Sequence, residues 1–255
     1  MKSTASLTVE LDGAGNSVVR RLRSMAPLTL VPRRRGSSAT GGAVVHLVGS
    51  ATSPLGGDDL SLRVRVGAGA RLLLRGIAAS LALPGHGPGG SRGSIDIDVE
   101  DGGTVEYLPE PTVVTSRAEH RAELSVRLAD SARACFRETL VLGRSGEEPG
   151  GLVSSTSLER GGIPLLRHTF EPGRQRLRAS HTHLGGARVL ANEVVVWDRD
   201  PEPRSEADWA LQPLAGGGSL TTVLTADTVT ARRRLAEARA VHPSGGELTP
   251  VEPAE

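Results

Sequence analysis

The chain contains very little cysteine and very few aromatic residues. Cys135 is the single cysteine among 255 residues, so no disulfide can form within the chain, which fits a reducing compartment. Phe, Trp and Tyr together make up only 2% of the residues, which predicts a core of Val, Leu, Ile and Ala. Such scarcity also disfavours the aromatic platforms on which proteins stack single-stranded nucleic acid.

Long apolar runs and an excess of charge of one sign are missing too. No run of about eighteen apolar residues occurs, so the sequence predicts no membrane span. Residues 1–10 lack the apolar segment of a secretory signal. The 30 Lys and Arg and the 29 Asp and Glu give a net charge of +1, which predicts no nucleic-acid footprint. We therefore expect a soluble cytoplasmic protein that binds neither nucleic acid nor membrane.

Common catalytic motifs are absent from the sequence. It contains no P-loop, no G-x-S-x-G elbow and no H-E-x-x-H pattern, and most of its 7 histidines are isolated. These absences favour a protein that is not an enzyme.

Strict alternation of apolar and polar residues is the dominant pattern. It covers residues 60–66 (LSLRVRV), 95–99 (IDIDV) and 122–128 (AELSVRL), and each segment is followed by a turn and a second strand. The strand ends Val66, Val99 and Leu128 are 33 and 29 residues apart. A repeated strand–turn–strand unit predicts a mostly β protein of stacked, coiled sheet layers, similar to a solenoid; a β-sandwich is the alternative.

The C-terminal part favours one or two short helices. Residues 230–241 are rich in helix formers, and a weaker helix is expected over 204–211. We expect a single β domain over residues 1–242 and a disordered, polar tail over 243–255.

Two groups of residues could touch a metal ion. His181 and His183 lie two apart on an expected strand, so their imidazoles would share one face of it. This pair could form half of a metal site, or the face could simply be polar. Asp96, Asp98 and Glu100 form an acidic ladder, which could pass a divalent ion or simply pair with nearby arginines.

Glu106 and Glu110 are placed more unusually. Alternation puts Val105 and Tyr107 on one face of a strand, and Glu106 and Leu108 on the other. A carboxylate that shares a face with leucine needs a partner if it is buried. Glu110 lies between two prolines, which restrict its backbone. Either both carboxylates bind backbone donors or arginines, or they line a polar path or a partner groove.

The turn before the first repeat contains Asp58, and the second strand of the third repeat contains Cys135. An aspartate at a glycine turn needs no function, but it could touch an ion or a basic partner. Cys135 is expected to be a small core residue.

Four segments, taken in order, resemble one known family. They are 54–70 (PLGGDDLSLRVRVGAGA), 103–113 (GTVEYLPEPTV), 137–147 (RETLVLGRSGE) and 162–167 (GIPLLR). Together they resemble motifs of the urease accessory protein UreD family, also called UreH. Tyr107 stands where the family usually has Trp, and Glu110-Pro111 where it has Gln-Glu, so the chain resembles a divergent member.

This resemblance implies a function in urease maturation. UreD-type proteins are not enzymes; they scaffold apo-urease with a UreF-type accessory protein and, through the complex, a UreG-type GTPase that brings nickel. The resemblance implies a coiled β fold and an internal polar route, with Ni(II) as transient cargo and no tightly bound cofactor.

By position, five residues match polar motif residues of the family: Asp58, Glu106, Glu138, Arg144 and Glu147. We expect these residues and Glu110 to line the route or an interface. Transient metal contact is expected at Asp58, Glu106, His181 and His183.

Two alternatives stay open. The chain could be a β scaffold of another complex. It could also be a carbohydrate-active β-solenoid enzyme that uses Glu106 and Glu110, although sugar clefts are usually rich in aromatic residues.

Overall fold

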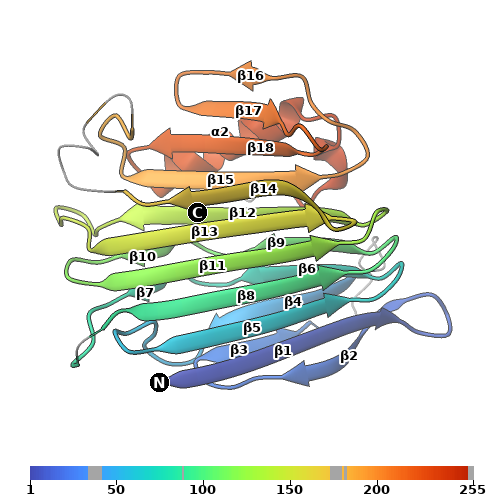
Figure 1. Cartoon of the computed structure of the whole chain (residues 1–255), viewed down its shortest axis with the longest axis horizontal. Coiled ribbons are helices and arrows are strands. Elements are labelled where there is room, and N and C mark those ends of the chain that lie inside the picture. Colours follow the sequence, from blue (N-terminus) through green and yellow to red (C-terminus); the bar gives the residue numbers. More distant parts are fainter. Residues whose placement is uncertain (34–41, 88, 173–179, 181–182, 252–255) are drawn as a thin grey trace.

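Two β-sheets stacked face to face form the body of the protein (Figure 1). The computed structural model describes residues 1–33, 42–87, 89–172, 180 and 183–251. The first sheet has seven strands, which are β1 (Lys2–Leu11), β2 (Ser17–Arg23), β5 (Asp59–Val66), β8 (Ser91–Val99), β11 (Glu119–Leu128), β13 (Gly151–Arg160) and β14 (Ile163–Phe170). Their order across the sheet is β14-β13-β11-β8-β5-β1-β2.

The second sheet has eleven strands. They are β3 (Leu28–Pro32), β4 (Ala43–Gly49), β6 (Arg71–Gly76), β7 (Ser80–Ala82), β9 (Thr104–Leu108), β10 (Thr112–Val114), β12 (Arg133–Leu142), β15 (Val189–Val196), β16 (Arg204–Ser205), β17 (Trp209–Pro213) and β18 (Ser219–Thr225). The main path runs β16-β17-β18-β15-β12-β9-β6-β4-β3, and β10 joins β12 to β7.

The chain winds between the sheets as a coil. β5, β8, β11 and β13 pair in parallel in the first sheet, and the chain passes through β6, β9 and β12 of the second sheet between them. Val66 pairs with Val99, and Val99 with Leu128, so the repeat seen in the sequence is the register of the sheet. The predicted solenoid-like stack is confirmed. Parallel strands need such crossovers, whereas an antiparallel sandwich does not.

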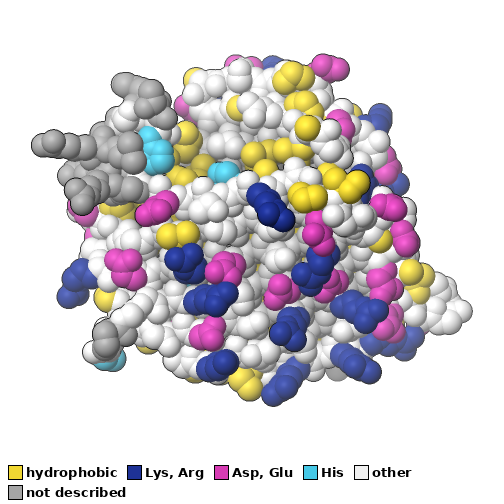
Figure 2. Space-filling model, in the orientation of Figure 1, with side chains coloured by type: hydrophobic (Ala, Val, Ile, Leu, Met, Phe, Trp, Pro, Cys, Tyr) yellow, Lys and Arg dark blue, Asp and Glu magenta, His cyan; other side chains and the backbone are white. Residues whose placement is uncertain are grey.

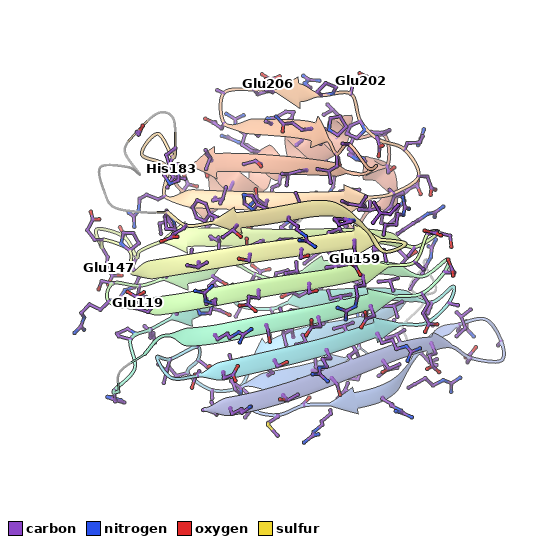
Figure 3. The ribbon with its side chains drawn as sticks, in the orientation of Figure 1. Glu119, Glu147, Glu159, His183, Glu202 and Glu206 are labelled. Atoms are coloured by element: carbon purple, nitrogen blue, oxygen red, sulfur yellow. The ribbon has the colours of Figure 1, made fainter. Side chains whose placement is uncertain are left out.

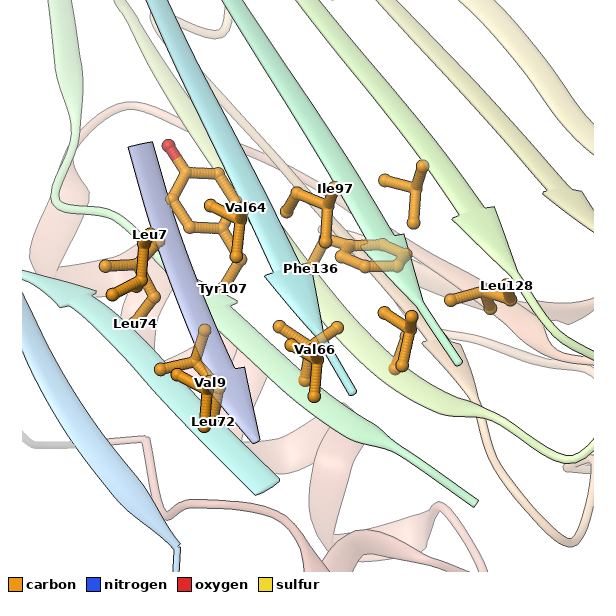
Figure 4. Close-up of a cluster of buried hydrophobic side chains, with 14 of the residues drawn as sticks. Leu7, Val9, Val64, Val66, Leu72, Leu74, Ile97, Tyr107, Leu128 and Phe136 are labelled. Carbon is orange, nitrogen blue, oxygen red and sulfur yellow. The ribbon is translucent and has the colours of Figure 1, made fainter. Parts of the chain in front are cut away.

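Aliphatic side chains fill the space between the sheets. Leu7, Val64 and Ile97 point inward from the first sheet and are at most 2% exposed (Figure 4). Tyr107 and Phe136 point inward from the second sheet into the same cluster (Figure 4). The expected aliphatic core is therefore present, with two of the few aromatic side chains at its centre.

A helix near the C-terminus covers the outer face of the second sheet. α2 (Thr228–Val241) begins at Asp227, whose side chain accepts a hydrogen bond from the Thr230 N–H, an N-cap that satisfies a free donor of the first turn. Ala231, Leu235 and Ala238 of this helix are buried in one cluster with side chains of β15, β17 and β18. No helix in the described part of the chain is long and apolar enough to cross a membrane.

The prediction of a weaker helix over residues 204–211 is wrong. Residues 204–205 and 209–213 form β16 and β17, which pair with each other, and β17 also pairs with β18. Trp209 and Leu211 alternate with more exposed residues and are buried beside α2, so pairing in the sheet overrides the local helix propensity.

The tail also differs from the expectation of disorder, as far as Val251. A 3-10 turn covers Gly245–Glu247, and Leu248 is only 5% exposed in a cluster with Leu108, Cys135, Val195 and Trp197. The Trp197 indole N–H donates to Glu247 at 3.0 Å. One buried leucine and specific hydrogen bonds fix a segment that composition alone marks as polar.

Candidate functional site

A cavity of about 210 Å³ lies between the two sheets. Side chains from both sheets line it, including Tyr107 of β9, His120 of β11 and Glu138 of β12. Aliphatic side chains such as Leu62 and Ile95 line it as well, so the cavity has a mixed apolar and polar lining.

Glu138 supplies a carboxylate to this cavity. It lies on the inner face of β12, where the Ser154 hydroxyl of β13 donates to Oε1 at 2.5 Å. Burial raises the pKa of Glu138, and the hydrogen bond from Ser154 offsets this only in part. Burial and the neighbouring Glu138 also raise the pKa of Tyr107. Glu138, which matches a family motif by position, therefore lies in the interior of the protein.

His120 is a cavity residue that the sequence analysis missed. It is 9% exposed, and its Nδ1 lies 2.9 Å from the Ser91 hydroxyl. Burial lowers the pKa of His120 to about 4, so the ring is neutral at physiological pH. The available signal was alternation, since His120 continues the inward series of Ala122 and Leu124 back to the start of β11.

Glu110 lines this cavity and also a second, open depression. That depression has a volume of about 640 Å³ and is also lined by Arg144, Arg188 and Arg232. Glu110 lines both spaces. Its carboxylate forms an ion pair with Arg232 of α2. We call the open depression the arginine groove, and we call the boundary at Glu110, the residue that lines both spaces, the mouth of the cavity.

Glu106 lies on the opposite face of the second sheet from the cavity. Val105 and Tyr107 are buried in the inner core, whereas Leu108 belongs to the outer cluster with Trp197 and Leu248, as alternation predicted. Thr249 of the tail donates to both Glu106 oxygens, from its backbone N–H and from its hydroxyl, each at 2.9 Å. Glu106 and Glu110 therefore contact different elements and do not form a pair.

A buried ionic cluster lies beneath α2. Glu193 of β15 is 2% exposed and accepts hydrogen bonds from Arg137 of β12 and from Arg239 of α2. Burial acts to raise the pKa of Glu193, but the two guanidinium groups outweigh it and lower that pKa. Arg239 also lies 3.4 Å from the Cys135 sulfur, and burial raises the pKa of this thiol. The cluster fastens the helix to the sheet, and Cys135 is the core residue that was expected.

Asp58 is 5% exposed and has three donors. The Met1 ammonium lies 2.7 Å from Oδ1, and the Ser53 hydroxyl and Leu55 N–H donate to Oδ2 at 2.7 and 2.9 Å. Burial acts to raise the pKa of Asp58, but these hydrogen bonds and the ammonium charge lower it. These contacts fix the turn before β5 against the first strand.

Arg144 and Glu147 form a local pair in the loop after β12. Glu147 accepts from the backbone N–H and the guanidinium of Arg144 and from the Ser116 hydroxyl, which together hold its pKa well below the usual range. Glu147 lies at the end of the molecule where β11 begins (Figure 3). Its contacts order this loop beside the arginine groove.

The remaining metal candidates have other partners or fall outside the described residues. His181 lies outside them, and His183 Nε2 is 3.1 Å from the Pro172 carbonyl oxygen. Asp98 pairs with Arg127, and Glu100 with Arg65, on the exposed face of the first sheet, where acidic and basic side chains intermingle (Figure 2). Nowhere in the described ranges do three His, Cys, Asp or Glu side chains gather as a metal site would require.

Comparison with known proteins agrees with the motifs. The family described as "UreD urease accessory protein" matches residues 2–252. Urease accessory protein UreD 1 of Saccharopolyspora erythraea is 59% identical over 251 residues, 98% of each chain. UreD of Frankia alni is 39% identical over 272 residues, which cover 92% of this chain and 91% of that one. UreD of Streptomyces avermitilis is 37% identical over 245 residues, 93% and 96% of the two chains.

The match extends from the first strand to the ordered tail, and so includes the cavity, the arginine groove and the Glu106 contact. The chain therefore belongs to the UreD family of urease accessory proteins.

Proposed function

We propose that this protein is a non-catalytic scaffold for urease maturation, and that Ni(II) passes through the cavity between its sheets as cargo. Its partners in this proposal are a UreF-type protein, bound directly, a UreG-type GTPase within the same complex, and apo-urease. The location we propose is the cytoplasm, where such a GTPase finds its nucleotide. Family membership supports the link to urease, and the cavity supports the route.

The cavity carries the metal part of the proposal because its donors are few and of the right kind. Carboxylate oxygen and neutral imidazole nitrogen both bind Ni(II). Glu138 offers an oxygen, and His120 offers Nε2 in the tautomer whose Nδ1–H donates to Ser91. Glu110 and Glu123 also line the cavity, but they are paired with Arg232 and Arg92. A route must release its cargo, so dispersed donors suit it better than a closed set of four.

Both alternatives from the sequence receive less support. The carbohydrate hypothesis needs two carboxylates across one cleft, but Glu106 is bound by Thr249 and Glu110 by Arg232. A scaffold for a complex unrelated to urease predicts no association with a UreF-type protein, so a pull-down with that protein separates this alternative from the lead proposal.

Urease activation in a host that lacks its own UreD tests the proposal. We expect the parent chain to restore urease activity and nickel content, and Glu138→Gln to reduce both. Glu159→Gln is the matched control, because Glu159 lies at the far end of β13, away from the cavity lining (Figure 3). Failure of the parent chain to activate urease would sink the proposed function, and full activity of Glu138→Gln would remove the cavity route.

Asp58→Ala and Glu106→Ala extend the same assay. Both residues hold structural contacts, so their protein levels must be measured beside urease activity. Normal activation at normal protein level would remove either residue from the functional set.

A further inference from the structure

The backbone of Glu110, at the mouth of the cavity, has little freedom to move. Glu110 lies between Pro109 and Pro111, whose rings fix the backbone on both sides. The Pro111 carbonyl oxygen accepts the Ser80 N–H at 2.9 Å. Gly76 packs so closely that a Cβ there would come within 2.6 Å of the Glu110 nitrogen. Glu110 is therefore held in place between the cavity and the arginine groove.

Arg232 of α2 is the partner of Glu110 at the mouth. Its guanidinium pairs with Glu110, and the two side chains are 33% and 28% exposed, so water reaches the pair. An arginine side chain has several rotatable bonds and can leave such a pair without a change in the backbone. Arg144, Arg188 and Asp227 line the same groove, and Arg144 is paired with Glu147.

We propose that Arg232 gates the cavity: a cation crosses between the cavity and the arginine groove only after Arg232 leaves Glu110. The proposal rests on the proposed function in taking Ni(II) as the cargo. While the pair is closed, the guanidinium neutralises the Glu110 carboxylate and repels an approaching dication. Once the pair opens, Glu110 becomes a free oxygen ligand at the boundary. Arg232 is thus a positioning residue, which acts through Glu110.

Nickel binding to the purified full chain tests the gate. The test is calorimetric titration with NiCl2 at pH 7.5. It compares the parent chain with two single variants, Arg232→Met and Arg232→Lys, and with the double variant that combines Arg232→Met and Glu110→Gln. Arg232→Met should bind Ni(II) about fivefold more tightly or better, because the carboxylate is released. Adding Glu110→Gln should cancel the gain. Arg232→Lys keeps the charge and should bind as the parent does.

Arg233→Met is the matched control on the same helix. Arg233 is 64% exposed and lies 4.0 Å from Glu237, and it does not line the groove. Its loss should leave nickel affinity unchanged. Equal affinities for Arg232→Met and Arg233→Met would overturn the gate, as would a gain that survives Glu110→Gln. A circular-dichroism melt of each variant shows whether it is folded. If Arg232→Met does not fold, Arg232→Lys tests whether the positive charge at this position sets the nickel affinity.

The two proposals fail in different ways. If the parent chain activates urease but Arg232→Met binds nickel as the parent does, only the gate is lost. If the parent chain does not activate urease, the maturation proposal is lost, whatever the calorimetry gives.

Discussion

Thr249 satisfies both oxygens of Glu106, although 143 residues separate them in the sequence. Its backbone N–H donates to Oε2 and its hydroxyl to Oε1, and Arg239 of α2 donates to the Thr249 carbonyl oxygen. The tail is thereby clasped to the outer face of the second sheet. Glu106, which the sequence analysis expected to line a route or an interface, is a fastening point for the end of the chain.

Thr249→Val should lower the free energy of unfolding by about 1.5–3 kcal/mol, since it removes a hydrogen bond to a charged group. Urea denaturation at pH 7 measures the loss, and amide exchange in residues 243–251 should become faster. Thr8→Val is the control, because Thr8 forms no side-chain hydrogen bond with the described residues and lies half-buried on the other sheet. A loss equal to that of Thr8→Val would mean that the clasp contributes nothing.

Glu193→Gln should destabilise the protein by roughly 3–5 kcal/mol, because it leaves Arg137 and Arg239 buried without a counter-charge. Glu237→Gln, an exposed partner of Arg234 on α2, should change the free energy of unfolding by less than about 0.5 kcal/mol. Chemical denaturation of both variants checks the contrast. Similar small losses in the two would refute the importance of the buried cluster.

Stability should depend on pH through His120. Its folded pKa of about 4 lies below the ordinary histidine pKa of 6.5, so the unfolded chain takes up the proton first as the pH falls. The free energy of unfolding should therefore drop between about pH 6.5 and pH 4, and His120 should account for roughly 2–3 kcal/mol of that drop.

His120→Asn isolates this contribution, because asparagine can still meet the Ser91 hydroxyl but does not titrate. Urea denaturation from pH 7.5 to pH 4 should give a shallower slope for the variant than for the parent. Parallel curves would show that His120 does not resist protonation in the folded protein.

Glu138→Gln should stabilise the protein at pH 7 while it impairs urease activation. The folded pKa of Glu138 is raised, so the unfolded chain gives up this proton more readily. Stability associated with the protonated carboxyl is complete below the unfolded pKa and is lost as the pH rises through the folded one. The gain over the parent should therefore appear at pH 7 and vanish at pH 4, with Glu159→Gln showing neither change.

Local patterns predicted the coil and the helix α2, but they did not predict β16, β17 and the ordered tail. Val66, Val99 and Leu128 end strands that alternate strictly between apolar and polar residues. These three residues pair with one another across the sheet, so the ends of the alternating segments predict the register of the strands. By contrast, Trp209 belongs to a strand because β18 lies beside it, and Leu248 is ordered because Trp197 and Leu108 cover it. Neither neighbour can be found by reading the sequence around these residues.

The candidate site divides in the same way. Alternation placed Glu106 and Leu108 together on one face, and two prolines indicated a rigid Glu110. The partners of these carboxylates, Thr249 and Arg232, lie in a distant tail and helix. The cavity itself depends on which inward positions face each other across the sheets, and this is a property of the folded coil.

The winding of the chain also determines how its length can change. β5 and β8 are one turn of the coil apart, and the residues of β8 from Arg92 to Val99 pair one by one with those of β5, as β9 pairs with β6. Duplication or loss of a whole turn would leave the neighbouring strands in register, because the turns on either side could still pair with each other. An insertion of a single residue within a strand would instead reverse the facing of every side chain beyond it. The complete turn is therefore the unit by which the length of this β coil can change without loss of strand register.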